Sequence, residues 1–275
     1  MKYAICNETF EGWDIRDIIR KVAEIGYTGL ELAPFTLDTD IRRVPEAKLR
    51  DIAETAAKSG IKVVGLHWLL AKTEGFHLTH PDPKVRKATG EYLVALAKAN
   101  SLLGGGVMVF GSPKQRDVLE GVKPDDAWRW AAETFRSVID RIAEAGSVIC
   151  MEPLAPAETN FVQTAAEGAG LVEMVAHPNF RLHLDVKAMA SEKTPTPELI
   201  RRFAHITGHF HANDANRRGP GFGDTDFVPI FKALKETEYA GWVSVEVFDY
   251  KPDPVTIAQQ SLEYMRKCEK AASHT

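Results

Sequence analysis

One pattern, a short apolar strand followed by an amphipathic helix, recurs along the whole chain and restricts the fold more than any other feature. In the first fifty residues the β-prone run KYAIC precedes apolar residues at helical spacing from Ile15 to Ile25, Gly26 ends the helix, and the run GLEL follows. Similar units continue, with strand-like runs IKVVGLHW, VMVFGS, SVICMEP, FRLHLD, TGHFHAND and WVSVEVFD. The sequence therefore predicts eight strands that alternate with eight helices.

Alternating strands and helices predict parallel strand pairing, because a helix carries the chain back to the start of the next strand. Right-handed crossovers allow two results, an open doubly wound sheet or a closed barrel. Eight units of similar length in 275 residues favour the barrel. No linker or change in composition divides the chain. We therefore expect an α/β protein with one domain, a (β/α)8 barrel over residues 1–275.

Composition and charge exclude several classes of protein. The chain is 44% hydrophobic and 26% charged, as in ordinary globular proteins. Its 34 basic and 38 acidic residues lack the basic excess of nucleic-acid-binding proteins. Three widely spaced cysteines indicate a reducing compartment, and no run resembles a signal peptide or a membrane span of ~20 apolar residues. We expect a cytoplasmic protein that binds neither nucleic acid nor a membrane.

Four ionisable side chains stand at the ends of four consecutive predicted strands. They are Glu152 in ICMEP, Asp185 in LHLD, His211 in HFHAND and Glu246 in VSVEVFD. The active site of such barrels lies at the carboxyl ends of the strands, so each strand delivers one of these side chains to the same rim. Three carboxylates and one imidazole suit a divalent cation, with Mn²⁺ or Mg²⁺ favoured and Co²⁺ or Zn²⁺ possible. The sequence therefore predicts a metal site.

The four rim side chains, and the two histidines beneath them, each allow a second interpretation. The four side chains could form salt bridges with nearby Arg and Lys instead of holding a metal, although close carboxylates without a cation would repel one another. Strand alternation places His183 and His209 beneath the predicted ligands. Either histidine could orient a ligand, or it could be a hydrogen-bonded core residue, which is the interpretation we favour for His183.

The chain resembles the xylose isomerase-like TIM-barrel superfamily, and within it the group of sugar-phosphate isomerases and epimerases. The matching motifs are GYTGLEL, GIKVVGLH, MEPL, LHLD, HFHAND, GPGFGDTDF and GWVSVEVF, and they cover essentially the whole chain. In the ketose 3-epimerases of this superfamily, the residues that match the four rim side chains hold one divalent metal. The resemblance implies that Glu152 and Glu246 also transfer protons, that Glu158 and Arg217 bind the sugar, and that the protein is a homodimer.

Three functions are compatible with this resemblance. A metal that binds a ketose carbonyl acidifies the adjacent C–H and stabilises an enediolate. Two carboxylates can then remove a proton and return one, which gives epimerisation or isomerisation of a sugar substrate. If a β-hydroxyl leaves instead, the protein is a dehydratase or lyase that acts on a keto-sugar or cyclitol. A sugar-binding protein without catalytic activity is the third possibility.

One position departs from the epimerase pattern. The epimerases carry a histidine three residues after the strand-six aspartate, where this chain has Ala188. Lys187 could replace that histidine as a substrate contact, or it could pair with another residue on the rim or point into solvent. His67 and Trp68 end the third strand and are weaker candidates for sugar contacts, with the core as the alternative. We expect Glu31, at the end of the second strand, only to hold neighbouring loops together.

Overall fold

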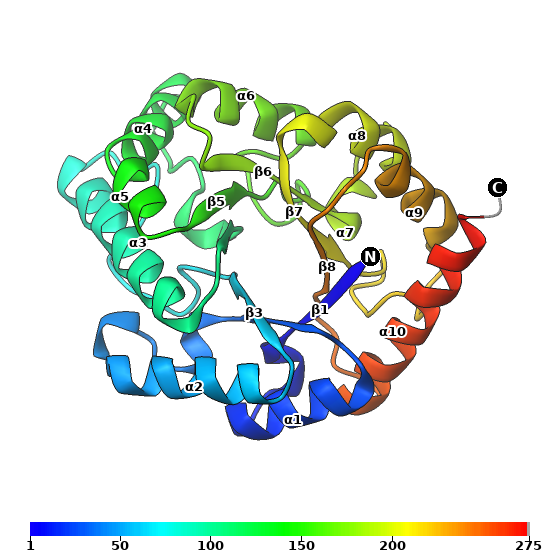
Figure 1. The fold of residues 1–275 in the computed structure, drawn as a ribbon. Helices are drawn as coiled ribbons and strands as arrows, with labels where there is room; N and C mark the ends of the chain where they lie inside the picture. Colours follow the sequence, from blue (N-terminus) through cyan, green and yellow to red (C-terminus); the bar gives the residue numbers. More distant parts are fainter. Residues whose placement is uncertain (274–275) are drawn as a thin grey trace.

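The computed structural model describes residues 1–273, which form one closed barrel of eight parallel strands surrounded by helices (Figure 1). Each strand pairs with the next along the chain, and β1 pairs with β8 to close the barrel. The predicted (β/α)8 fold is therefore confirmed. The strands are β1 Lys2–Cys6, β2 Gly29–Leu32, β3 Lys62–Leu66, β4 Val107–Phe110, β5 Val148–Met151, β6 Phe180–Asp185, β7 Thr207–Ala212 and β8 Trp242–Val245.

The helices form the outer ring around these strands (Figure 1). Within the described residues they are α1 Ile15–Ile25, α2 Glu46–Lys58, α3 Pro83–Leu103, α4 Pro124–Arg136, α5 Ile139–Glu144, α6 Ala165–Val175, α7 Val186–Met189, α8 Thr196–Phe203, α9 Phe227–Glu236 and α10 Pro254–Ala271. Five short 3₁₀ helices lie in the connections, at Asn7–Phe10, Pro34–Thr36, Ile41–Arg43, Pro113–Gln115 and Ala204–Ile206.

Within residues 1–273, ten α-helices replace the predicted eight, because one expected helix is interrupted and a short one is added. The predicted fourth helix divides into α4 and α5 at Ser137 and Val138. The Ser137 hydroxyl donates to the carbonyl of Thr134 at 2.7 Å, and Val138 leaves the helical region with φ −130°. The added helix α7 begins directly after Asp185, whose carboxylate accepts the backbone N–H of Ala188.

Local sequence fixes where the longer helices begin and end. Aspartate side chains accept backbone N–H groups at the first turns of α1, α3, α9 and α10, as N-cap residues usually do. Gly26 ends α1 and Gly104 ends α3, both in the left-handed conformation that glycine adopts without strain. These boundaries set the length of each connection, and so they set where the end of each strand meets the rim.

The hydrophobic core lies between the barrel and the ring of helices. Phe110 on β4, Phe135 on α4 and Phe180 on β6 pack there with ring centroids 5.4 and 4.6 Å apart. Each aromatic ring buries a large apolar area, so these contacts hold helices firmly against strands. The barrel interior is different, because buried histidines and carboxylates occupy it towards the carboxyl ends of the strands.

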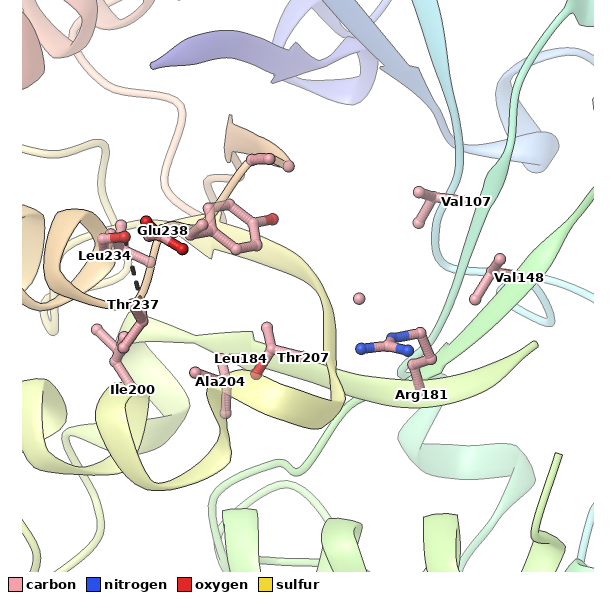
Figure 2. Close-up of a pocket in the computed structure, with 14 residues that line it drawn as sticks. Val107, Val148, Arg181, Leu184, Ile200, Ala204, Thr207, Leu234, Thr237 and Glu238 are labelled. Atoms are coloured by element: carbon pink, nitrogen blue, oxygen red, sulfur yellow. Dashed lines mark hydrogen bonds between the residues drawn. The ribbon is translucent and has the colours of Figure 1, made fainter. Parts of the chain in front are cut away.

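A cavity of about 350 Å³ lies at the opposite end of the barrel (Figure 2). Val107, Val148 and Thr207 line it where β4, β5 and β7 begin, and Leu234 of α9 contributes to its wall. Arg181 extends into it (Figure 2). Its guanidinium donates to the carbonyl of His205 at 2.9 Å. Because this cavity lies away from the carboxyl ends of the strands, it is separate from the predicted site. Among residues 1–273, no helix has the length and apolar character needed to cross a membrane.

Candidate metal centre

The barrel brings the four predicted rim side chains together. Glu152 directly follows β5, Asp185 ends β6, His211 lies next to the end of β7, and Glu246 directly follows β8. All four are buried, with at most 4% of each residue exposed. Side chains in a strand alternate between its two faces, so these residues share the interior face of the barrel and converge at one end.

Three of the four form a compact set of potential metal ligands, together with a histidine that we expected in the core. Glu152, His183, Asp185 and His211 each offer one ligand atom, and these atoms lie within 4.8 Å of one another. Among the described residues, Glu246 falls outside this set, but its Oε2 lies 3.2 Å from Nδ1 of His211. The structure therefore places Glu246 at the edge of the centre.

The position of His183 differs from the expectation of a hydrogen-bonded core residue. Within the described part of the chain, neither of its ring nitrogens has a hydrogen-bond partner, although the residue is fully buried. Its Nε2 lies 4.0 Å from Oε1 of Glu152, and its ring centroid lies 4.2 Å from that of His211. Burial, followed by the neighbouring His211, lowers the pKa of His183 well below its usual value. A neutral imidazole without a partner is suited to metal coordination.

Hydrogen bonds hold the carboxylates of Asp185 and Glu246 in place. Asp185 accepts the side-chain amide of Asn213 at 2.5 Å and the backbone N–H of Ala188 at 2.7 Å. Glu246 accepts the indole N–H of Trp68 at 2.7 Å, and Nδ1 of His67 lies 3.3 Å from the same oxygen. His67 and Trp68 therefore contact a predicted acid-base residue directly. Partners of this kind orient metal ligands.

Burial and mutual repulsion do not change the pKa values of the carboxyl groups equally. Burial, followed by the charges of Glu246 and Asp185, raises the pKa of Glu152 well above its usual value. Burial and the charge of Glu246 also raise the pKa of Asp185, to about 6. For Glu246, burial opposes ionisation, but the contacts with His211 and His67 outweigh it and lower its pKa. Several carboxyl groups that repel one another beside an unpaired imidazole form a group able to hold a divalent cation.

Glu31 has a larger role than the sequence suggested. Its carboxylate is fully buried on the barrel axis, 2.8 Å from Nε2 of His209 and 3.2 Å from Nε2 of His211. The expectation that Glu31 only holds loops together is wrong, because its carboxylate contacts two buried histidines of β7. The sequence does contain one signal, a single charged residue within the apolar strand GLEL.

Arg116 is a second residue that the sequence did not identify. It is fully buried, and its guanidinium donates to the carbonyl of Glu152 at 2.5 Å and to that of Val162 at 3.1 Å. Burial lowers its pKa to about 10. Arg116 therefore fixes the backbone that carries Glu152. The surrounding sequence, KQRD, resembles an ordinary polar loop and gives no sign of this role.

Two of the five residues expected to bind substrate, Trp68 and Glu158, line a cavity of about 300 Å³. The predicted acid-base residues Glu152 and Glu246 line it as well. Lys187 does not extend freely towards this space, because its ammonium nitrogen lies 2.7 and 2.8 Å from the two carboxylate oxygens of Glu158. Two predicted substrate contacts therefore bind each other.

Arg217 lies farther from the predicted ligands than we expected. It is exposed and lines an adjoining hollow of about 540 Å³, and its guanidinium carbon lies 5.8 Å from the ring centroid of Phe248. Phe248 also lines the cavity that contains Glu152, so the two spaces meet at this ring. The carbonyl of Arg217 accepts the backbone N–H groups of Phe248 and Asp249 at 2.9 and 3.1 Å. These bonds fix the seventh loop to the segment that follows β8.

Comparisons with known proteins agree with this architecture. The model of the xylose isomerase-like TIM barrel family matches residues 19–268. The D-psicose 3-epimerase of Ruminiclostridium cellulolyticum is 30% identical over 253 residues, which cover 90% of this chain and 82% of the relative. The 3-dehydro-D-guloside 4-epimerase of Escherichia coli K12 is 23% identical over 276 residues, or 98% of this chain and all of the relative.

Solved structures show the same fold. The D-psicose 3-epimerase of Clostridium cellulolyticum H10, crystallised with D-tagatose, superposes with a TM-score of 0.85 at 24% identity, covering 98% of this chain and 99% of the other. The 3-keto-D-glucoside 4-epimerase of E. coli also gives 0.85, at 19% identity, covering 98% of this chain and all of the other. The chain therefore belongs to the xylose isomerase-like TIM-barrel family and is an enzyme of the isomerase and epimerase type.

Proposed function

We propose that this protein is a divalent-metal-dependent epimerase or isomerase that acts on a keto-sugar by proton transfer through an enediolate. One observation carries the proposal: Glu152, Asp185 and His211 converge with His183 at the active-site end of the barrel, and Glu246 lies beside His211. The names of the relatives add support, since they include a D-psicose 3-epimerase and a 3-dehydro-D-guloside 4-epimerase.

The residues present fit a metal ion. His183 has two buried ring nitrogens without partners among the described residues, and the carboxyl groups of Glu152 and Asp185 repel each other. Glu152, Asp185 and His211 would hold the ion, with Glu246 or His183 as a further ligand. Mn²⁺ or Mg²⁺ suits such a carboxylate-rich set, and Co²⁺ or Zn²⁺ would also bind. When bound, the ion supplies Lewis-acid stabilisation of the negative charge that develops on the substrate oxygen.

The two glutamates are placed to transfer the proton. Glu152 and Glu246 both line the cavity of about 300 Å³, and they come from non-adjacent strands of the barrel. Trp68 and His67 fix the carboxylate of Glu246, which favours its role as the base that removes a proton from carbon. Glu152 lines the same cavity and is the candidate for the carboxylate that returns a proton.

Deuterium exchange tests this proposal. The protein is loaded with Mn²⁺ or Mg²⁺ and incubated in deuterated water with ketoses, keto-glycosides and inososes, and exchange at the carbon next to the carbonyl is followed. We expect at least one compound to exchange, and we expect Glu246→Gln to slow exchange by at least ~100-fold. Glu133→Gln, a change of an exposed glutamate on α4, is the matched control and should leave the rate unchanged.

Two other outcomes would change the assignment. Release of water with appearance of a dione or enone absorbance would identify a dehydratase on the same scaffold. If no compound exchanges, or if Glu246→Gln exchanges as fast as the wild-type protein, the proposed proton transfer is wrong.

A further inference from the structure

Two cavities lie side by side at the carboxyl ends of the strands. The first, of about 300 Å³, contains the carboxylates of Glu152 and Glu246. The second, of about 500 Å³, is lined by residues from the ends of β1 and β2 and from the loop after β8, including Trp13 and Tyr250. Trp68 and Lys72 line both cavities, so the two spaces share one wall.

The second cavity provides space that the proposed chemistry does not need. Small-molecule sites typically have volumes of ~300–1,000 Å³, so the first cavity suits a compact ligand such as one sugar ring. The second cavity is larger than the first. Of the residues proposed to hold the metal or transfer protons, none lines it within the described chain. A ligand that fills both spaces is therefore larger than a free monosaccharide.

The walls of the second cavity combine aromatic faces with polar groups. Trp13, Phe35, Trp68 and Tyr250 contribute rings. Trp13 is 41% exposed, whereas the other large hydrophobic side chains among residues 1–273 are buried or half-buried. An exposed indole that lines a polar cavity offers a flat apolar face to a partner that also forms hydrogen bonds. Glu11 and Lys48 provide exposed hydrogen-bonding groups nearby. A sugar ring, with its C–H faces and peripheral hydroxyls, matches this combination.

Trp68 connects the two cavities to the reaction centre. Its indole N–H donates to Glu246 at 2.7 Å, and its ring stacks on Phe248 at 5.9 Å and lies 5.7 Å from Phe35. Trp68 also has a positive φ of 51°, which is uncommon for a residue other than glycine. A ligand that spans the cavities would therefore contact the residue that positions the proposed base.

We propose that the substrate is a keto-glycoside of disaccharide size, in which the oxidised ring occupies the first cavity and the second sugar unit occupies the second cavity. This inference rests on the proposed function and specifies its substrate class. The Lys187–Glu158 ion pair is consistent with it, because that pairing leaves Glu158 less able to bind hydroxyls of the reacting ring. Binding of a remote, non-reacting group can then supply the energy that orients the reacting ring.

The test compares three compounds with the manganese-loaded protein: D-psicose, methyl 3-keto-D-glucopyranoside and a 3-keto-disaccharide such as 3-keto-cellobiose. Exchange in deuterated water gives kcat/KM for each. We expect the disaccharide to exceed the methyl glycoside by at least about tenfold, and Trp13→Ala to reduce that ratio by about tenfold. Trp13→Phe, which keeps an aromatic face, should restore most of the ratio.

Binding measurements test the proposed sugar site even if the protein turns over none of the three compounds. Calorimetry with cellobiose should show weak binding to the wild-type protein, and Trp13→Ala should reduce the affinity, while thermal unfolding confirms that the variant is folded. Equal kcat/KM for disaccharide and methyl glycoside, with a ratio insensitive to Trp13→Ala, would overturn the keto-disaccharide assignment. Exchange of none of the compounds, with cellobiose binding that depends on Trp13, would instead overturn the proposed function and keep the sugar site.

Discussion

Lys187 and Glu158 form an ion pair in which one ammonium nitrogen contacts both carboxylate oxygens, at 2.7 and 2.8 Å. The lysine side chain also lies 4.3 Å from the ring centroid of Phe248, so it is held between a carboxylate and an aromatic face. Its positive charge is close enough to Asp185 and Glu152 to offset part of the rise in pKa that burial and the neighbouring carboxylates cause in both. Lys187 therefore competes electrostatically with any cation in the centre.

Replacing Lys187 with methionine should strengthen metal binding. Removal of one positive charge near the carboxylates favours a divalent cation by about 1 kcal/mol, or roughly fivefold in Kd. Lys187→Arg keeps the charge and is the control. Titration of the metal-stripped protein with Mn²⁺ measures the effect, and unchanged or weaker binding in Lys187→Met would contradict the electrostatic role assigned to this lysine.

The Glu152 carboxylate occupies space that is free only because residue 111 is a glycine. A Cβ atom at Gly111 would overlap Oε2 of Glu152, so Gly111→Ala should displace the carboxylate and weaken Mn²⁺ binding by at least about tenfold. Gly170→Ala is the control, since the added methyl group on α6 would meet no other atom within 4 Å. The control should stabilise the fold by about 0.5–1 kcal/mol and leave the Kd unchanged. Normal Mn²⁺ affinity in Gly111→Ala would show that Glu152 is not a ligand.

Asn213 should affect metal affinity without touching the metal. Its side-chain amide donates to Asp185, and its carbonyl oxygen accepts the backbone N–H of Lys187 at 2.8 Å. Loss of such an orienting partner typically reduces metal affinity by ~10–100-fold, which is the range we expect for Asn213→Ala. Asn216→Ala, in the same loop, removes a hydrogen bond to the carbonyl of Phe222 and serves as the control. Equal Kd values for the metal in the two variants would show that Asn213 does not support the ligand Asp185.

Metal affinity should fall as the pH is lowered from 7.5 to 5.5. The pKa of Asp185 is raised to about 6, and that of Glu152 is raised well above its usual value, so both carboxyl groups retain protons to higher pH than ordinary acids do. A metal must displace those protons, and binding therefore weakens as protonation increases. Calorimetry in buffers of different ionisation enthalpy measures the protons released. Affinity that does not change over this range would show that the groups are already ionised.

Much of the fold was predictable because its determinants are local. Apolar spacing and glycine stops identified eight strands, and the helix expected from Ile15 to Ile25 agrees with α1. The break between α4 and α5 was not predictable, since the apolar spacing continues from Phe135 through Ile139 to Ile142. The break depends on the Ser137 hydroxyl, which donates to the backbone carbonyl of Thr134, and hydrophobic periodicity does not reveal such a bond.

The residues of the metal centre were predictable only where strand alternation alone determines which side chains face the barrel interior. The residue at a strand end and the residue two before it share a face, which located Glu152, Asp185, His211 and Glu246 and also His183. The roles of Arg116, Asn213 and Glu31 depend on contacts between segments far apart in the chain, such as the bond from Arg116 to the carbonyl of Glu152. No spacing rule within a single sequence encodes such contacts.

Gly208 has a consequence for the strand that carries His211. The pairing of β6 with β7 runs from Leu182 opposite Thr207 to His183 opposite His209, so Gly208 is an extra residue in the ladder. A side chain there would collide with Cys150 and Arg181. Beyond this irregularity the ladder is regular, with His209 opposite His183 and His211 opposite Asp185, so the imidazoles keep the same face as their partners on β6. The mismatch between the two strands is thus confined to the end of the barrel where Gly208 and Arg181 line the other cavity, away from the metal centre.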